Sequence, residues 1–492
     1  MANTQEYYLY SYTDLFKFNF SRILFCLLLY YSCSLLLPFL KSSNSTRVFH
    51  LREMLKKIAN TKNIYRPVAL LISIYFPPEP GGGSSAAWNR ALILSKVGYR
   101  VFVICGMPSY PSGKVLEHKY KGKLFYLESI GQINLIRLRV LPLSTTGYFN
   151  RFWIFLSFVF LSLLYIPVIL RKTGRIELVY SIAPILFSSF CGFVYSKITK
   201  SFFVYEVSDI WPEELIVFET LFSSIILTVG KFVAKLSYMV PDAIIAISQL
   251  AADHISNQYR PGVNIYVLPI GADPSRFHRL SKKDSRVQLI KGKILPAELE
   301  DKFVILYSGL ISGATRVDNL AYAAEKLKDD ERTIAFLVVG EGEEKAKLQE
   351  MKHDFSLDNL YLLPFQPRDL MPRIICAADV CTVSLPSEPI FDVDVPTKFY
   401  EYLACGKPQL GICGGEVAKI IESRKIGLTV RDGAINQLVF TIKKLKNCRE
   451  LIEAMETNSA VVSEEFSLDS MVSRFIDLLK KEKKPIPEIR LH

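Results

Sequence analysis

Several signatures of metal and cofactor chemistry are absent from this chain of 492 residues. Its six histidines stand in no HExxH or clustered spacing, so we expect no structural or catalytic metal. Its nine cysteines include no CxxC pair, and their odd number favours reduced thiols in a cytosolic compartment over a disulfide framework. No GxxxxGK(S/T) sequence is present for a P-loop.

Acidic residues are also in short supply, with 48 Asp and Glu against 60 Lys and Arg, a net charge of +12. Such a surplus favours anionic partners, namely phosphorylated substrates, lipid headgroups or nucleic acid. The basic residues are scattered, without an aromatic platform or a helix-turn-helix signature, so we expect no nucleic-acid partner. Half of the residues are apolar, which excludes a disordered chain and suggests a membrane contact.

Two long apolar runs account for much of this hydrophobicity. Residues 23–40 are uncharged and lie within an N-terminal extension, 1–66, whose basic end fits a cytosolic juxtamembrane segment. Residues 152–170 form the second run. Each is near the lower limit of about 18 residues for crossing a bilayer. We expect the first to insert into a membrane, and the second to be a span, an interfacial helix or a core helix.

From residue 67 onward, short apolar runs alternate with helical patterns, which is typical of α/β folds with buried parallel strands. A glycine-rich turn and a helix over 86–96 separate the first two strands. The strands predicted in this half are 68–74, 101–105, 178–181, 202–206, 243–247 and 265–268. In the second half we predict strands over 303–307, 335–339, 360–363 and 380–383, with helices over 318–328 and 372–378.

The pattern predicts two doubly wound, Rossmann-like domains, 67–280 and 281–470, with a C-terminal helix and basic tail over 471–492. Two such domains face a central cleft at the carboxyl ends of their strands, where open α/β folds bind ligands.

The glycine-rich turn Gly81–Ala86 formally matches the GxGxxA pattern of dinucleotide-binding proteins. The next strand, however, runs into Gly106 without the carboxylate that would hold a ribose, so we do not favour a nicotinamide cofactor. Glycines at a helix start let backbone N–H groups approach an anion closely. A tight turn without a ligand is the alternative.

The segment 395–408, VPTKFYEYLACGKP, is the most informative one. Pro396 suits the first turn of a helix, and Lys398 and Glu401 then share one face near its start. A cation beside exposed amides suits a diphosphate, and a carboxylate one turn later can accept from two ribose hydroxyls. A surface helix with a solvated Lys–Glu pair is the alternative.

This segment resembles the donor-binding motif of retaining GT-B glycosyltransferases of family 4, the "group 1" set. The resemblance covers about residues 67–480 and is closest to the subgroup that builds surface polysaccharides and lipid-linked glycans. The other matching segments are YFPPEPGG at 75–82, GMPSYPSGK at 106–114, VSDIWPE at 207–213, IGAD at 270–273, LVVGEG at 337–342 and AAD at 377–379.

The resemblance implies transfer of a sugar from a nucleotide-sugar donor, with retention and without metal or another cofactor. Lys398 and Arg316 would contact the diphosphate, Glu401 the ribose, and Gly82 and Gly83 would let the first domain close over the phosphates. Lys398 is thereby both a binding and a catalytic residue.

Asp209 is the second predicted catalytic residue, because it follows the strand 202–206 and should face the cleft, where it could orient the acceptor hydroxyl. Capping of a helix near Trp211 is the alternative. His118 is read as a solvated loop residue. The acceptor is expected to be a lipid-linked or membrane-associated glycan, with the catalytic domains on the cytosolic face of a membrane.

Three positions depart from the family pattern. The first of two glutamates falls on Val393, Arg316 alone remains in the loop after the strand 303–307, and Ile270 replaces an asparagine. These departures leave the donor sugar open. A nucleotide-sugar epimerase on the same fold and a catalytically silent partner of an active transferase are the alternatives, and the missing glutamate favours the second.

Overall fold

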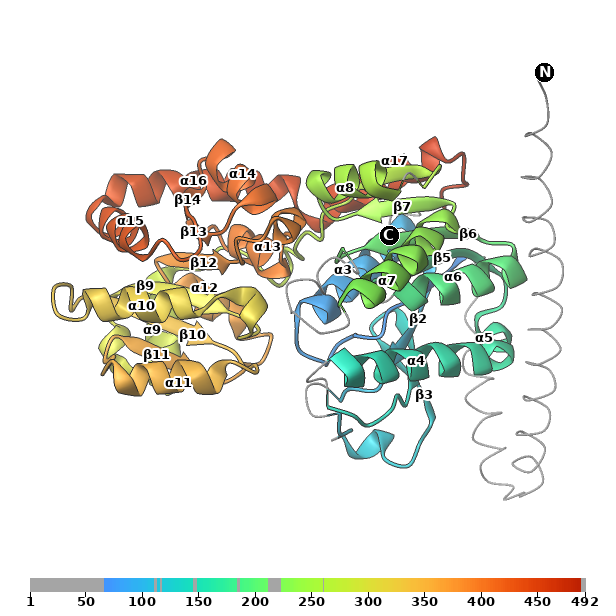
Figure 1. Ribbon diagram of the computed structural model, residues 1–492, viewed down its shortest axis with the longest axis horizontal. Helices are drawn as coiled ribbons and strands as arrows, with labels where there is room; N and C mark the ends of the chain where they lie inside the picture. The colour runs from blue at the N-terminus through green and yellow to red at the C-terminus, as the bar shows by residue number, and fades with distance from the viewer. Residues whose placement is uncertain are drawn as a thin grey trace. The chain divides into compact units, whose positions relative to one another are not determined.

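The computed structural model describes residues 66–109, 113–115, 117–144, 148–183, 186–210, 223–259 and 261–487 (Figure 1). The predicted membrane segment 23–40 lies outside these residues. Residues 66–162 and 169–492 form one compact unit. Among the described residues, no helix on its own is long and apolar enough to cross a membrane. Asn150–Leu164 and Ile166–Thr173, bent by 60°, reach that length and composition only as a pair.

The first domain contains an eight-stranded sheet in the order β3-β4-β2-β1-β5-β6-β7-β8. All its neighbouring strands pair in parallel except β3 and β4. The strands are β1 Val68–Ile72, β2 Arg100–Gly106, β3 Phe125–Ile130, β4 Ile133–Leu138, β5 Ile176–Ile182, β6 Phe202–Val207, β7 Ala243–Ala246 and β8 Asn264–Val267. The predicted parallel strands are confirmed; the β3–β4 hairpin is an addition, closed by a turn in which Gly131 has a φ of 57°.

Helices connect these strands and cover the sheet (Figure 1). They are α3 Gly82–Val97, α4 Tyr148–Leu164, α5 Ile166–Thr173, α6 Leu186–Thr199, α7 Ser223–Met239 and α8 Gln249–Tyr259, with a short 3₁₀ turn η1 His118–Tyr120. Gly81 precedes α3 with a φ of 115°, a conformation that only glycine adopts easily. The glycine-rich sequence therefore begins the 16-residue helix that follows β1 after residues 73–81, four residues before the predicted start at residue 86.

The second domain contains a six-stranded parallel sheet in the order β11-β10-β9-β12-β13-β14, the doubly wound order that the sequence predicts. Its strands are β9 Phe303–Ser308, β10 Ile334–Val339, β11 Leu360–Leu363, β12 Val380–Ser384, β13 Gln409–Ile412 and β14 Gly427–Val430. Its helices are α9 Lys282–Lys291, α10 Asp318–Leu327, α11 Lys345–Asp354, α12 Met371–Ala377, α13 Thr397–Ala404, α14 Gly415–Ser423, α15 Ile435–Asn447 and α16 Arg449–Glu465, with 3₁₀ turns η3 Ala297–Leu299, η4 Gly313–Thr315 and η5 Pro389–Val393. Buried apolar clusters cover both faces of this sheet.

The last helix, α17 Leu468–Lys481, packs in the core of the first domain rather than the second. Phe475 is fully buried there, with its ring centroid 6.0 Å from that of Tyr180 on β5. Lys96 on α3 pairs with Asp469 of α17 at 2.6 Å. The chain therefore returns to its first domain after completing the second one.

We expect Phe475→Ala to lower the free energy of unfolding of the first domain by about 3–5 kcal/mol, because it leaves a cavity among buried side chains. Urea unfolding followed by tryptophan fluorescence measures this loss, because one of the three tryptophans, Trp88, packs against the same cluster. The matched control is Phe440→Ala on α15, where the side chain is 69% exposed and a change within about 0.5 kcal/mol is expected. Equal effects of the two substitutions would contradict the assignment of α17 to this core.

Candidate functional site

Lys398 and Glu401 lie on the first turn and a half of α13, as predicted. Pro396 is the N-cap of this helix, with a φ of −68° that its ring fixes. The Glu401 side chain is only 15% exposed, and the first turn of the helix carries no acidic residue. The two side chains therefore do not form a solvated surface pair.

The Lys398 amine is held by an aromatic ring. Its Nζ donates a hydrogen bond of 2.6 Å to Tyr307 Oη and lies 3.9 Å from the centroid of that ring. The Tyr307 hydroxyl in turn donates to the carbonyl oxygen of Leu310 at 2.5 Å. Burial lowers the pKa of Lys398 to about 7, and the nearby Glu401 carboxylate opposes this shift. The amine therefore loses its charge at a lower pH than a solvated lysine does.

Glu401 is paired with an arginine that sequence reasoning missed. Arg368, in the loop between β11 and α12, donates from Nη2 to Glu401 Oε1 at 3.2 Å. Its Nη1 donates to the Ser85 hydroxyl at the start of α3. Burial raises the pKa of Glu401 above its usual value, and the positive charges of Arg368 and Lys398 offset only part of this shift. The only available signal was that Arg368 follows a strand whose carboxyl end lies at the same edge of the sheet as the end of β9.

The glycine-rich start of α3 lies against the start of α13. Thr397 Oγ1 donates to the carbonyl oxygen of Gly82 at 3.3 Å, and a Cβ added to Gly82 would lie 3.3 Å from Thr397 Oγ1. A Cβ at Gly83 would lie 3.6 Å from the ring of Tyr75. Gly82 is therefore beside the residue that precedes Lys398, whereas Gly83 packs on its own domain.

Arg316 is not in contact with this group of residues. It caps η4 in the left-handed conformation, with a φ of 42°. Its guanidinium pairs with Asp432 at 3.0 Å and with Asp318 at 3.3 Å. These two aspartates compensate its charge locally. Among the described residues it has no hydrogen bond or ion pair with Lys398 or Glu401.

Asp209 follows β6 as predicted, and it faces a second carboxylate, Asp394, between η5 and Pro396. Burial raises the pKa of Asp209 to about 6, and burial together with the negative charge of Asp209 raises that of Asp394. Asp394 Oδ1 is buried without a hydrogen-bond partner in the described part of the chain. The segment before it is fixed by the hydroxyl of Ser248, which donates to the carbonyl oxygen of Val393 at 2.6 Å.

The family pattern places a glutamate at the position of Val393. Asp394 is the next residue, and this neighbouring carboxylate was the signal that sequence reasoning overlooked. The predicted alternative role of Asp209, capping a helix near Trp211, falls on residues outside the described part. His118 is exposed at the start of η1 and belongs to no cluster among the described site residues.

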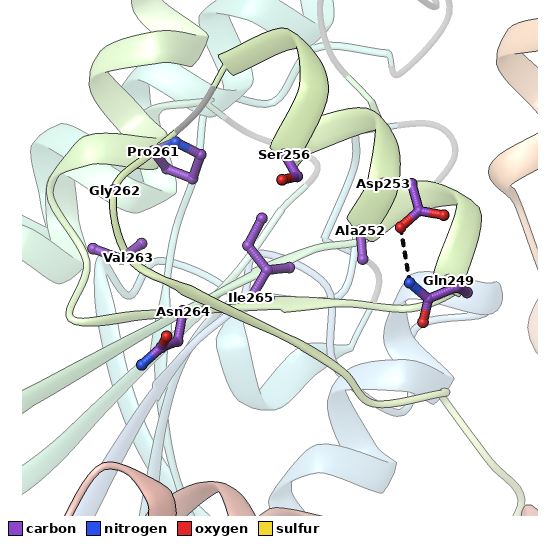
Figure 2. Close-up of a pocket in the computed structure, with 9 residues that line it drawn as sticks. All are labelled: Gln249, Ala252, Asp253, Ser256, Pro261, Gly262, Val263, Asn264 and Ile265. Atoms are coloured by element: carbon purple, nitrogen blue, oxygen red, sulfur yellow. Dashed lines mark hydrogen bonds between the residues drawn. The ribbon is translucent and has the colours of Figure 1, made fainter.

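A cavity of about 500 Å³ lies elsewhere, between α8 and β8 (Figure 2). Gln249 and Asp253 line one side of it and share a hydrogen bond of 2.8 Å, while Pro261–Ile265 line the other. No predicted site residue borders it. The cavity is therefore separate from the predicted site residues around α13.

Comparison with known proteins identifies the second domain. Residues 294–462 match the family model "Glycosyl transferases group 1". These residues form a group 1 glycosyltransferase domain. Over 345 residues the chain is 23% identical to WcaI of Escherichia coli (strain K12). The name of that protein describes it as a colanic acid biosynthesis glycosyl transferase. The match covers 68% of this chain and 81% of WcaI.

Solved structures of low sequence identity share the fold. Sucrose-phosphate synthase from Thermosynechococcus elongatus is 17% identical with a TM-score of 0.69, covering 85% of this chain and 99% of that one. Anabaena HepE in complex with UDP-glucose is 16% identical with a TM-score of 0.59, covering 84% and 99%. WaaG, a glycosyltransferase involved in lipopolysaccharide biosynthesis, is 16% identical with a TM-score of 0.58, covering 84% and 99%. The predicted GT-B fold of this glycosyltransferase homologue is thereby confirmed.

We expect Arg368→Ala to lower the free energy of unfolding by about 1–3 kcal/mol, because it leaves the Glu401 carboxylate poorly solvated and unpaired. Adding Glu401→Gln should recover most of the loss, and a double-mutant cycle measured by urea unfolding gives this coupling. The exposed pair Arg449–Glu453 on α16, whose side chains are 90% and 60% exposed, is the control, with a coupling below about 0.5 kcal/mol. A coupling energy between Arg368 and Glu401 that is no larger than that of the control pair would show that Arg368 and Glu401 are not coupled.

Proposed function

We propose that the protein transfers a sugar from a nucleotide-sugar donor to a glycan acceptor, with retention at the anomeric carbon and without a metal ion. The observation that carries this proposal is the placement of Lys398 and Glu401 at the start of α13, against the glycine-rich start of α3. The structures of HepE were determined with UDP and with UDP-glucose, which supports a nucleotide-sugar ligand for this fold.

The donor diphosphate would lie at Lys398. The amine has no carboxylate in hydrogen-bond contact among the described residues, so a phosphate oxygen can become its partner. The N-terminus of α3 adds positive potential, since its first turn contains no acidic residue. Fixed positive charge of this kind stabilises a departing diphosphate as its charge grows in the transition state. Arg316 remains the proposed second cation; its Nε and Nη1 are paired with Asp318 and Asp432, so Nη2 is the group that would contact a phosphate.

The ribose of the donor would bind at Glu401. Oε1 already accepts from Arg368, which leaves Oε2 to accept from a ribose hydroxyl. Arg368 would keep the carboxylate ionised and in place, so we add it to the proposed site as a positioning residue. Because Arg368 also contacts Ser85, this pairing links the donor helix to the first domain.

The acceptor hydroxyl would be oriented by Asp209. A carboxyl group whose pKa is raised to about 6 can accept a hydrogen bond, and a proton, from a hydroxyl group at neutral pH. Asp394 is the second carboxylate at this position, on the opposite domain. We propose that the acceptor is a lipid-linked or membrane-associated glycan at the cytosolic face of a membrane. The names of WcaI and WaaG, which refer to colanic acid and lipopolysaccharide, support a surface glycan.

A screen of UDP-, GDP- and ADP-sugars by thermal shift tests donor binding, because a ligand stabilises the folded form in proportion to its occupancy. Glu401→Ala should weaken the binding of the stabilising nucleotide by roughly 1–3 kcal/mol, the cost of a lost buried hydrogen bond. Lys398→Met should slow turnover more than it weakens binding. Glu453→Ala on α16, at an exposed position, is the control and should change neither.

Unchanged kinetics in both site variants would place the donor elsewhere. Conversion of the donor without any acceptor would indicate an epimerase. Failure to bind any nucleoside diphosphate would favour the silent partner, to which the valine at position 393 already points.

We expect nucleoside diphosphate binding to take up a proton at Lys398 above pH 7. The pKa of the free amine is about 7, and a bound diphosphate favours the ammonium form and raises it. Affinity should therefore fall as the pH rises above 7, by up to about tenfold per pH unit. Calorimetry between pH 7.5 and 9, in buffers of different ionisation enthalpy, measures the uptake; the phosphates, with a second pKa of about 6, are then fully ionised.

Lys398→Gln should bind more weakly and without proton uptake, whereas Lys480→Gln on α17, where the side chain is 61% exposed, should behave as the unsubstituted protein does. Equal uptake in the Lys398→Gln variant would assign the proton to another group.

A further inference from the structure

Three helices of the first domain form one layer. The Tyr195 hydroxyl on α6 donates to the carbonyl oxygen of Ser162 on α4 at 2.8 Å, and the Ser189 hydroxyl on α6 donates to that of Ser237 on α7 at 2.9 Å. α6 therefore lies between α4 and α7, and the three helices run side by side in Figure 1. We call them the α4–α6–α7 layer.

The layer is apolar on both of its faces. Its inner face is buried in the domain, for example at Phe158 on α4 and Ala234 on α7, both fully buried. Its outer face is also apolar: Phe160 is 61% exposed and Phe232 is 64% exposed. The other large apolar side chains exposed on the layer are Phe152, Trp153, Ile198, Val229, Leu236 and Met239.

The exposed residues of α7 follow helical spacing, at positions 229, 232, 236 and 239. Because i, i+3, i+7 and i+10 share one face of a helix, these side chains form a single outward stripe. A stripe of this kind in water, on a helix whose other face is already packed, is the pattern of a surface that another apolar phase covers.

The charge of the layer has one sign. None of the helices α4, α5, α6 and α7 contains an aspartate or a glutamate. Lys231 and Lys235 are exposed beside the stripe of α7, and Lys197 is exposed at the end of α6. Apolar and aromatic side chains on helices whose only charged residues are cations match an anionic lipid surface, where the rings enter the interface and the lysines contact headgroups.

Two other occupants of this face fit less well. A second copy of the chain would place lysines against lysines, with no acid on these helices to pair with them. A transmembrane arrangement of α4 would remove from the domain the contacts that Phe158 and Ser162 make there, since both are fully buried. The outer face is therefore better suited to lie on a surface.

We propose that the outer face of the α4–α6–α7 layer docks on an anionic lipid bilayer, with α4 and α7 lying in the plane of the interface. The proposal rests on the proposed function only in naming where a lipid-linked acceptor would be met. Lipid contact itself needs neither donor nor acceptor, so it can fail or succeed independently of sugar transfer.

The test uses the full chain with a photocrosslinking residue, Phe232→p-benzoylphenylalanine, on vesicles of phosphatidylcholine with or without phosphatidylglycerol. We expect crosslinks to lipid at position 232 that increase when phosphatidylglycerol is present. Phe440→p-benzoylphenylalanine on α15 is the matched control, because Phe440 is also highly exposed, at 69%, but belongs to the second domain. It should give few lipid crosslinks on the same vesicles.

Replacing Lys231 and Lys235 by glutamine should reduce the lipid crosslinking at position 232 by roughly fivefold per lysine. Because the readout is local, membrane anchoring by the segment 23–40 does not produce it. Equal lipid crosslinking at 232 and 440 would overturn the proposal. Crosslinks at 232 to a second copy of the chain, or to another segment of the same chain, would overturn it as well.

Discussion

The site depends on an ammonium group that is kept from water without a carboxylate in contact with it. Lys398 donates to the Tyr307 hydroxyl and lies over its ring, and these contacts only partly offset the lost hydration. The lowered pKa of Lys398 reflects the part of the desolvation cost that these contacts do not offset. The nearest acid, Glu401, is engaged by Arg368. A ligand that brings its own negative charge therefore gains more from this amine than it would gain from a solvated lysine.

Two helices, α13 and α3, begin next to each other at this site. The start of α13 carries Lys398, and the start of α3 approaches it closely enough for Thr397 to donate to the Gly82 carbonyl oxygen. A side chain at Gly82 would press on Thr397. The helix starts supply aimed amide groups, while Arg368 offsets the charge of Glu401, so the balance around Lys398 stays positive.

Much of the fold could be predicted from the sequence because the parallel strands are buried on both faces and appear as short continuous apolar runs. The β3–β4 hairpin escaped because Phe125–Ile130 is half-exposed and carries Glu128, so its pattern is weak. Lys398 and Glu401 share one short segment, and their spacing alone places them together. Arg368 could not be found in this way, because it reaches the site through the end of another strand, whereas Asp394 lies only two residues before Pro396 and was overlooked.

The apolar run 152–170 shows a different limit of sequence reasoning. Its composition suits a span, an interfacial helix or a core helix equally, since each requires nearly continuous apolar residues. Burial separates these cases: α4 hides Phe158 and Ser162 and exposes Phe160. Such a helix packs one face into its own domain and leaves an apolar side chain of the other face exposed. Asp209 belongs to the same domain, so a lipid surface met by this face would bring a tethered acceptor to the domain that is proposed to orient it.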